Sequence, residues 1–326
     1  MKLGGEATSI EFQIGPRGRF SLRQASGEIA IRGVEGDSAR VRARDDRPLG
    51  DLFEIEAGSG RLELRQRERF GIGMKMFRND SPELEIEVPH GATVSIDSAS
   101  AELVASDLSG DKRFRTASGD MELLRFAGPV DIQTVSGDVS LEGLAPVDLA
   151  VKSVSGDIRV RVPRLRRLDM TTTSGDLLLD AELAGDGPFA LRSISGDARI
   201  VARSGIRVEA ETITGDISSE LPSKRESGLG RKVVIVGKAG PTLAFRSVSG
   251  DLQVVAPRDA AILTTLEPPS PPSAPTAPSA STPPAPPTDS ADIDASRLEI
   301  LRALERGDIT VAEATDRLGT LEGVLR

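Results

Sequence analysis

The chain has 326 residues, a formal net charge of −9 at pH 7, and enough apolar residues, 38%, to form a buried core. It contains no Cys, Trp or Tyr, and His90 is its single histidine. These absences exclude disulfides, a thiolate nucleophile, Cys-based metal sites and a multi-histidine metal centre. The acidic balance and the scarcity of aromatic residues argue against a nucleic-acid partner.

The N-terminal segment, residues 1–20, has no apolar run of signal-peptide length. No other segment approaches the roughly 20 apolar residues that a membrane-spanning helix needs. We therefore expect a cytoplasmic protein without a transmembrane segment, for which peripheral contact with a membrane stays open. A chain whose leader had been removed would show the same pattern.

Residues 1–88 contain short runs of alternating apolar and polar residues separated by Gly, Pro and Asp. This pattern predicts strands, and we assign the segment to the N-terminal strands and cap of a larger β fold. The runs cover residues 9–14, 28–31, 39–43, 62–64 and 84–88.

Residues 69–80 interrupt these strands and fit neither the period of a strand nor that of a helix. The segment combines two glycines with Ile72, Met74, Met76 and Phe77. We expect a loop that either folds over an open end of the core or inserts into a partner or a membrane surface. Its four apolar residues are therefore candidates for interaction.

Residues 89–257 repeat a Ser-Gly-Asp turn. Its glycines are Gly119, Gly137, Gly156, Gly175, Gly196, Gly215, where Thr replaces Ser, and Gly250. They are separated by 18, 19, 19, 21, 19 and 35 positions, so residues 220–240 hold either one degenerate copy or an inserted loop. Degenerate copies at 26–28 and 100–102 indicate that the repeat extends toward the N-terminus.

Each copy of the repeat places a hydroxyl residue and usually a β-branched residue before the turn, and alternating apolar residues after it. Glycine adopts the positive φ that a sharp corner favours, and the Asp carboxylate accepts nearby backbone N–H groups. One such unit cannot bury its apolar face, but stacked units can. The sequence therefore predicts an all-β fold, a parallel β-solenoid with coils of about 18–21 residues.

After residue 257 the pattern ends. Residues 258–291 are rich in Pro, Ala and Ser and predict an extended, semi-rigid linker. Residues 292–326 regain a helical period, with a break at Gly307 and a capping box formed by Thr310 and Glu313. We expect a small helical hairpin that binds a protein partner or self-associates, because it is too short for a large core. Its candidate contact residues are Leu301, Leu304, Leu318 and Leu321.

The aspartates of the turns would form a column in a stacked solenoid, and calcium could bridge them. The column comprises Asp120, Asp138, Asp157, Asp176, Asp197, Asp216 and Asp251. Calcium-binding β-rolls, however, have a period near nine residues and glycine-dense loops, which this sequence lacks. We therefore expect each carboxylate to stabilise its own turn and to face water.

Enzymatic sites would have to depart from the repeat, because a catalytic pair of carboxylates occurs once whereas a structural residue recurs. The turn aspartates recur in every copy. The columns of Ser and Thr lack a histidine that could activate them, so ladder hydrogen bonding explains them better. We predict neither enzymatic activity nor a cofactor.

Two further features have a structural interpretation. His90 follows Val88-Pro89 and should be a surface turn residue, and the basic residues 164–167 should form a solvated edge.

The chain resembles bacterial β-strand-repeat proteins of the putative adhesin family, whose function is unknown. The Val88-Pro89 pair, followed by Gly91, Val94, Ile96 and Ser98, and the units at 153–158 and 247–252 carry this resemblance, which covers about residues 10–257. It implies a β-solenoid with no established activity or cofactor, and a role in adhesion, scaffolding or envelope-stress regulation.

Residues 300–310, with Glu313 and Ala314 after them, resemble a short helical hairpin appended to bacterial proteins. Some relatives with this hairpin are linked to envelope-stress responses, which implies a role in interaction or oligomerisation.

Together these observations predict a non-enzymatic scaffold or interaction protein, in envelope-stress or surface-related regulation. It would combine a rigid β-solenoid with a tethered helical docking module. The first alternative is a calcium- or carbohydrate-binding adhesin, and the second is an enzyme that acts on polysaccharides.

Overall fold

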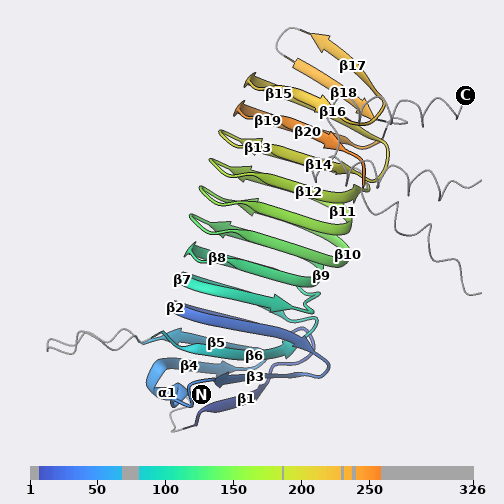
Figure 1. Ribbon diagram of the computed structural model, residues 1–326. Helices are drawn as coiled ribbons and strands as arrows, with labels where there is room; N and C mark the ends of the chain where they lie inside the picture. The colour runs from blue at the N-terminus through green and yellow to red at the C-terminus, as the bar shows by residue number, and fades with distance from the viewer. Residues whose placement is uncertain (1–6, 68–80, 186, 229–230, 237–239, 258–326) are drawn as a thin grey trace, which may run out of the picture. The chain divides into compact units, whose positions relative to one another are not determined.

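The computed structural model describes residues 7–67, 81–185, 187–228, 231–236 and 240–257, which form a stack of β-strands with one short helix (Figure 1). In chain order the elements are β1 (Ser9–Gln13), β2 (Arg19–Val34), β3 (Ser38–Ala43), α1 (Leu49–Leu52), β4 (Phe53–Gly58), β5 (Arg61–Gln66), β6 (Glu83–Pro89), β7 (Thr93–Ser106), β8 (Lys112–Ser118), β9 (Met121–Thr134), β10 (Val139–Lys152), β11 (Ile158–Thr172), β12 (Leu177–Leu183), β13 (Phe189–Ser193), β14 (Ala198–Ala202), β15 (Ile206–Thr214), β16 (Ile217–Ser219), β17 (Ser223–Gly228), β18 (Arg231–Val236), β19 (Thr242–Ser249) and β20 (Leu252–Val255).

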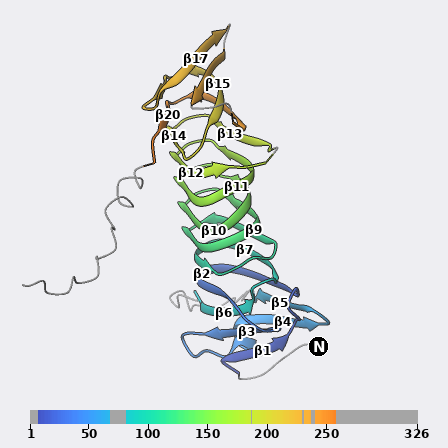
Figure 2. The ribbon, with the colours of Figure 1, turned by 90° about the vertical axis from the view of Figure 1, so that its right-hand side faces the viewer.

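One coil of the stack consists of two extended segments joined at a sharp corner. Around Gly119, β8 leads into the corner and the first half of β9 leads away from it. The chain turns back near Gly128, and the second half of β9 then pairs with β8 as part of the next coil. We call the segments before the corners the first face and the segments after them the second face. Figure 2 shows the coils as flattened loops stacked along the column.

The core lies between the two faces because side chains alternate between inside and outside along both of them. Phe114 and Ile132 point inward from the first face, and Met121 and Leu123 point inward from the second; all four are buried. Each coil adds a few such residues, and stacking covers them with the next coil. The apolar alternation in the sequence thus becomes one continuous core.

Neighbouring coils pair in parallel and in register. Leu149 lies opposite Val130 of the preceding coil and Leu168 of the following one, so identical positions form columns along the stack. The predicted all-β solenoid with parallel coils is confirmed.

The coils do not stack in the order of the sequence. On the first face β19 lies between β13 and β15, and on the second face β20 lies between β14 and β16. The coil of Gly250 therefore precedes the coil of Gly215 in space. The chain passes through the outermost coil first and then returns to fill the place beneath it.

Residues 220–240 were predicted to hold a degenerate copy or an inserted loop. They hold an insertion, because β17 and β18 form an antiparallel hairpin whose β18 pairs antiparallel with β15. Antiparallel strands also lie at the other end of the stack, where β1 pairs with β3, β3 with β6, and β4 with β5. Such pairs occupy the hydrogen-bonding edges that a bare parallel coil would expose.

Parallel stacking begins within the segment assigned to the N-terminal strands and cap. β2 pairs in parallel with β7 along almost its full length, which places Ser26 opposite Ser100 as the degenerate copies predicted. On its other side β2 pairs with β5 and then with β6, so these two strands complete a further coil. The corner of that coil is Ser81-Pro82-Glu83.

Several sequence predictions fall outside the described residues. These are the interaction candidates Ile72, Met74, Met76 and Phe77, the linker 258–291, and the hairpin 292–326 with its four leucines. Within the described ranges, no helix is long and apolar enough to cross a membrane.

Candidate functional site

The glycines of the corners are required for two separate reasons. Gly137, Gly156 and Gly175 have φ values of 120°, 111° and 118°, which side chains rarely adopt. A Cβ atom on Gly156 would also lie 2.3 Å from the carbonyl oxygen of Gly137 in the coil beneath. The corners therefore stack backbone on backbone, which fixes the registry of everything attached to them.

The hydroxyl residues before the corners donate hydrogen bonds within their own coil. Thr134 Oγ1 lies 3.0 Å from the carbonyl oxygen of Ser136, and Ser153 Oγ lies 3.1 Å from that of Ser155. The same contact recurs from Thr116, Thr172, Ser193, Ser247 and Thr212. For these residues the prediction of ladder bonding is thus corrected, because they close the turn in which they stand. The turn hydroxyls of Ser118 and Thr214 do bond the neighbouring coil, at Ser100 Oγ and the carbonyl of Val248.

The turn aspartates, by contrast, accept hydrogen bonds from the neighbouring coil. Asp138 Oδ1 accepts the backbone N–H of Asp157 at 2.8 Å, and Asp157 Oδ1 accepts that of Asp176 at 3.0 Å. The same bond continues through Asp197 and Asp251 to Asp216, and starts at Asp120. We predicted that each carboxylate stabilises its own turn, whereas six of the seven bond the next coil in space.

This acidic column is longer than the aspartates alone, because the register carries it into the N-terminal coils as Glu102, Glu28 and Glu83. Every coil of the stack has a carboxylate at this position. Among the described residues, no group of three or more His, Cys, Asp or Glu is placed to hold a metal ion. One oxygen of each of the six bonded aspartates is instead engaged by a backbone N–H.

An exposed apolar row runs along the same edge. The residue before each Ser-Gly-Asp corner points outward, and five of the six C-terminal coils carry Val or Ile there. We call these residues the edge row: Val135, Val154, Ile194, Val248 and Ile213, exposed by 53, 48, 52, 45 and 81%. The sixth coil has Thr173 at this position, whereas coils nearer the N-terminus have Ala25, Ala99 and Ala117.

The geometry of the edge row follows from the stacking. The carbonyl of Val135 accepts the N–H of Ser155 at 2.9 Å, and that of Val154 accepts the N–H of Ser174 at 2.9 Å. Neighbouring coils are therefore one strand spacing, about 4.8 Å, apart, and the row extends for roughly 24 Å, with Thr173 between Val154 and Ile194. The acidic column lies three residues further along each coil, so a hydrophobic strip and a negative strip run side by side.

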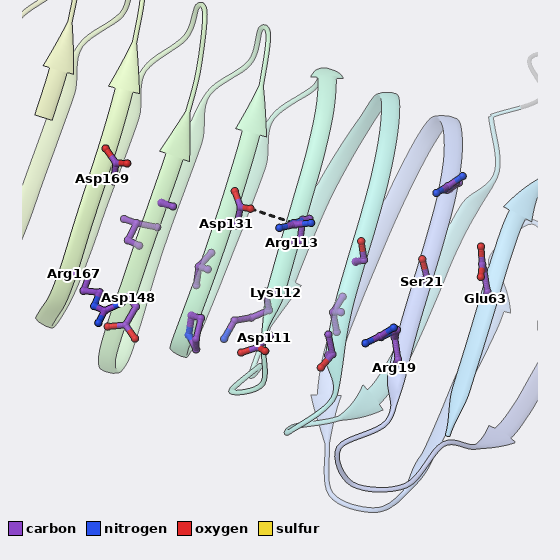
Figure 3. Close-up of a pocket in the computed structure, with 18 of the residues that line it drawn as sticks. Arg19, Ser21, Glu63, Asp111, Lys112, Arg113, Asp131, Asp148, Arg167 and Asp169 are labelled. Carbon is purple, nitrogen blue, oxygen red and sulfur yellow. Dashed lines mark hydrogen bonds and ion pairs between the residues drawn. The ribbon is translucent and has the colours of Figure 1, made fainter. Parts of the chain in front are cut away.

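A groove of about 890 Å³ crosses the first face (Figure 3). We call it the face groove. Its lining comes from outward residues of successive coils between β5 and β13, among them Arg19, Ser21, Glu63, Asp111, Arg113, Asp131, Asp148, Arg167 and Asp169, which Figure 3 labels. Because side chains on one face recur at every second residue, each coil contributes the same two or three positions to it. None of its lining residues is aromatic.

Carboxylates of the face groove stand outside the repeated turn positions, which a polysaccharide-acting enzyme would require. Three of them, however, contact arginines: Asp131 with Arg113 at 3.1 Å, Asp148 with Arg166 at 2.9 Å, and Asp169 with Arg192 at 2.6 Å. A glycosidase acid needs an apolar pocket that keeps it protonated. The arginine contacts instead give these three carboxylates a role in ion pairs between coils.

Lys112 is a buried amine that the sequence analysis did not single out. It occupies an inward position between Val94 and Val130 and is only 3% exposed. Its Nζ donates to the carbonyls of Leu108, at 3.3 Å, and Ala127. It also lies 5.4 Å from the centroid of the Phe126 ring. Burial lowers the pKa of Lys112 to about 8, and the charge of Asp111 opposes this shift.

His90 lies at the turn on the opposite side of the coil, as predicted. Its Nδ1 is 2.7 Å from the backbone oxygen of Asp107. Arg125 donates two hydrogen bonds to the Asp107 carboxylate, at 2.6 and 2.5 Å, and these hold the pKa of Asp107 below its usual range. This cluster joins three successive turns and has a structural role.

The basic residues 164–167 divide between two functions. Arg164 pairs with Glu182 at 3.3 Å and Arg166 with Asp148 at 2.9 Å, as expected of a solvated edge. Arg167 points into the face groove. The sequence alone does not show that Arg167 lines the groove, because this depends on the pairing register of the strands of the first face.

The chain has structural neighbours among solved bacterial proteins. A putative adhesin from Parabacteroides distasonis is 12% identical with a TM-score of 0.44, over 76% of this chain and 96% of that one. A putative adhesin from Bacteroides fragilis is 13% identical with a TM-score of 0.41, over the same two shares. A putative cell adhesion protein from Clostridium sporogenes is 12% identical with a TM-score of 0.27, over 76% and 99%.

A comparison with curated proteins gives no match. The family model described as Toastrack DUF4097 matches residues 18–255, which run from the start of β2 to the end of β20. This segment contains the corners, the acidic column, the edge row and the face groove. Because it makes up well over half of the chain, the protein belongs to the Toastrack DUF4097 family.

Proposed function

We propose that the protein is a non-enzymatic scaffold that binds a protein partner along the edge row. The observation that carries this proposal is the alignment of five exposed β-branched residues on one edge of a rigid stack. Exposed apolar residues scattered singly need no explanation, but a row along one edge that only Thr173 interrupts does. Its backbone is already fixed by the corners, so binding would order little of the protein itself.

The partner we propose carries a basic segment with apolar side chains. The edge row would bury the apolar side chains, and the acidic column beside it would face the basic ones. That column also argues against an anionic membrane as the occupant, because it would place a carboxylate from every coil at the lipid surface. It disfavours nucleic acid for the same reason.

The test is a triple variant of the edge row, Val154→Thr, Ile194→Thr and Val248→Thr, in the full chain. Thr173 shows that threonine fits this position in a folded coil. The matched control replaces two exposed apolar residues elsewhere, Val104→Thr and Leu144→Thr. A partner captured by the wild type is purified, and its Kd is measured for all three proteins.

We expect the edge-row variant to bind the partner at least tenfold more weakly and the control to bind within twofold of wild type. Equal binding by the edge-row variant, or an equal loss in the control, would exclude the edge row. A partner whose binding segment is neither basic nor apolar would also refute the proposal. Sedimentation velocity tests self-association. If the wild type is a dimer and the edge-row variant is a monomer, the edge row binds a second copy of this chain and not a different protein.

The predicted hairpin 292–326 remains a separate proposal, in which the linker 258–291 tethers a second docking module. Comparing the full chain with one that ends at Pro257 tests it, because a partner of the hairpin is lost on truncation. A partner of the edge row is retained. The cytoplasmic location and the link to envelope-stress or surface-related regulation stay predictions.

The calcium-binding alternative requires the acidic column to bind the ion directly. The observed N–H contacts give the aspartates a structural role without an ion. A ligand of the native state must raise its melting temperature. If the melting temperature does not change at millimolar calcium, this alternative is wrong.

A further inference from the structure

One part of the face groove differs in chemistry from the rest. Over the four neighbouring strands β5, β2, β7 and β8, arginines and hydroxyl residues predominate among the outward side chains. In that order the strands contribute Arg61, Glu63 and Arg65; Arg19, Ser21 and Arg23; Thr93, Ser95 and Asp97; and Arg113 and Arg115, with Asp111 directly before β8. Six of these twelve residues are arginines.

The hollow has a floor of short hydroxyl side chains. Ser21 on β2 lies opposite Ser95 on β7, and Arg19 lies opposite Thr93. Ser21, Ser95 and Thr93 are surrounded by longer side chains, and all three line the groove. Two serine hydroxyls about one strand spacing apart can both donate to the same bound group.

Most charges around this floor are already paired. Arg65 lies 2.8 Å from Glu63, Arg23 lies 3.5 Å from Asp97, and Arg113 lies 3.1 Å from Asp131. The guanidinium of Arg19 has no ion pair within the described part of the chain. Figure 3 shows it on β2, projecting into the groove close to Ser21.

Asp111 is the carboxylate of this region that lacks an arginine partner among the described residues. In register it follows Thr93, so it lies two coils from Arg19, at roughly 10 Å. The ammonium of Lys112 lies beneath the groove and opposes the charge of Asp111. The environment of Ser21 and Ser95 is therefore positive, although the whole chain carries a charge of −9.

We propose that the hollow over Ser21 and Ser95 binds an oxyanion group of an acidic polysaccharide. The fork of the Arg19 guanidinium would bind two oxygens of a carboxylate or sulfate, and the serine hydroxyls would donate to the same group. The groove extends over several more coils, so a linear polymer can lie along it. Because no aromatic residue lines the groove, recognition rests on charge and hydrogen bonds and not on stacking against sugar rings.

The experiment measures binding of fluorescently labelled polymers to the full chain at physiological salt, where non-specific attraction is screened. The probes are polygalacturonate, dextran sulfate and neutral dextran, with free galacturonate and inorganic sulfate as competitors. We expect the two acidic polymers to bind and neutral dextran not to bind. Arg19→Gln should weaken binding at least tenfold, because it removes a charged hydrogen bond.

The controls separate a site from general electrostatics. Arg161→Gln removes an exposed arginine of the second face and should change the Kd less than twofold. Arg19→Lys should retain part of the affinity, since it keeps the charge but not the fork, and Ser95→Ala should weaken binding a few-fold. Melting temperatures establish that each variant is folded.

Equal losses in Arg19→Gln and Arg161→Gln would overturn the proposal, as would binding of neutral dextran with the same affinity. Free sulfate that binds as tightly as the polymers would overturn the assignment to a polysaccharide. The edge-row variant should bind the acidic polymers like wild type. Failure of the proposed protein partner and failure of this site are therefore distinguishable.

Discussion

Lys112 makes the stability of the protein depend on pH in a way that can be calculated. Its amine is buried between the two faces, and the groups that contact it are carbonyls and an aromatic ring. Burial lowers its pKa to about 8, whereas an unfolded lysine titrates near 10.5. The folded state therefore releases this proton at a lower pH than the unfolded state.

The sign follows from the protons bound in each state. Below pH 8 both states carry the charge, and the folded state bears the desolvation penalty. Between pH 8 and 10.5 the unfolded state binds more protons, so the free energy of unfolding rises with pH. At 1.36 kcal/mol per pH unit, the rise is roughly 3 kcal/mol. No Tyr or Cys titrates in this window, because the sequence contains neither.

Urea unfolding followed by circular dichroism between pH 7.5 and 10.5 measures this rise, since the chain has no Trp to report by fluorescence. In Lys112→Met the rise should be absent. Lys152→Met, which removes an exposed lysine of the first face, should retain it. The reasoning is refuted if Lys112→Met and wild type gain the same stability, or if wild type gains none.

The stacked geometry supports three further predictions. Gly156→Ala should lower the free energy of unfolding by about 3–5 kcal/mol, because it combines backbone strain with a clash against Gly137. Gly36 has a similar φ but open space around it, so Gly36→Ala should lower it by only about 1–2 kcal/mol. Urea unfolding measures both. Asp157→Ala should cost about 1–2 kcal/mol, and Asp157→Asn, which retains the acceptor oxygen, should cost less; equal costs would contradict the hydrogen-bond assignment. Deleting residues 223–236 should expose the outer edge of β15 and cause concentration-dependent association by sedimentation, and a monomer at all concentrations would contradict this.

The corner geometry was predictable because it is local. Positive φ at glycine, a hydroxyl three residues before it and alternating apolar residues after it are all encoded within one copy of the repeat. The partners of the hydrogen bonds were less predictable, because they depend on distances between coils. The hydroxyl of Thr134 closes its own turn, while the carboxylate of Asp138 reaches the next coil, and one copy alone favours neither choice.

The order of the coils could not be predicted from the repeat. The coils of Gly215 and Gly250 have almost the same sequence pattern, so each satisfies the requirements of either position in the stack. What separates them is the hairpin of β17 and β18, which pairs antiparallel with β15 and so occupies the outer side of that coil. β19 is thereby left to pair with β13 and β15, on its two sides.

Both sites proposed above depend on positions that the repeat leaves free to vary. Inward positions are mostly apolar and corner positions are mostly Ser, Gly and Asp, so sequence changes there are limited by stability. The outward position before each corner changes from Ala in the N-terminal coils to Val and Ile in the C-terminal coils. The outward positions of the first face change from Arg and Ser to Asp and Ala along the groove. Because stacking does not need these changes, they are where selection for binding could act, and variants at these positions separate binding from folding.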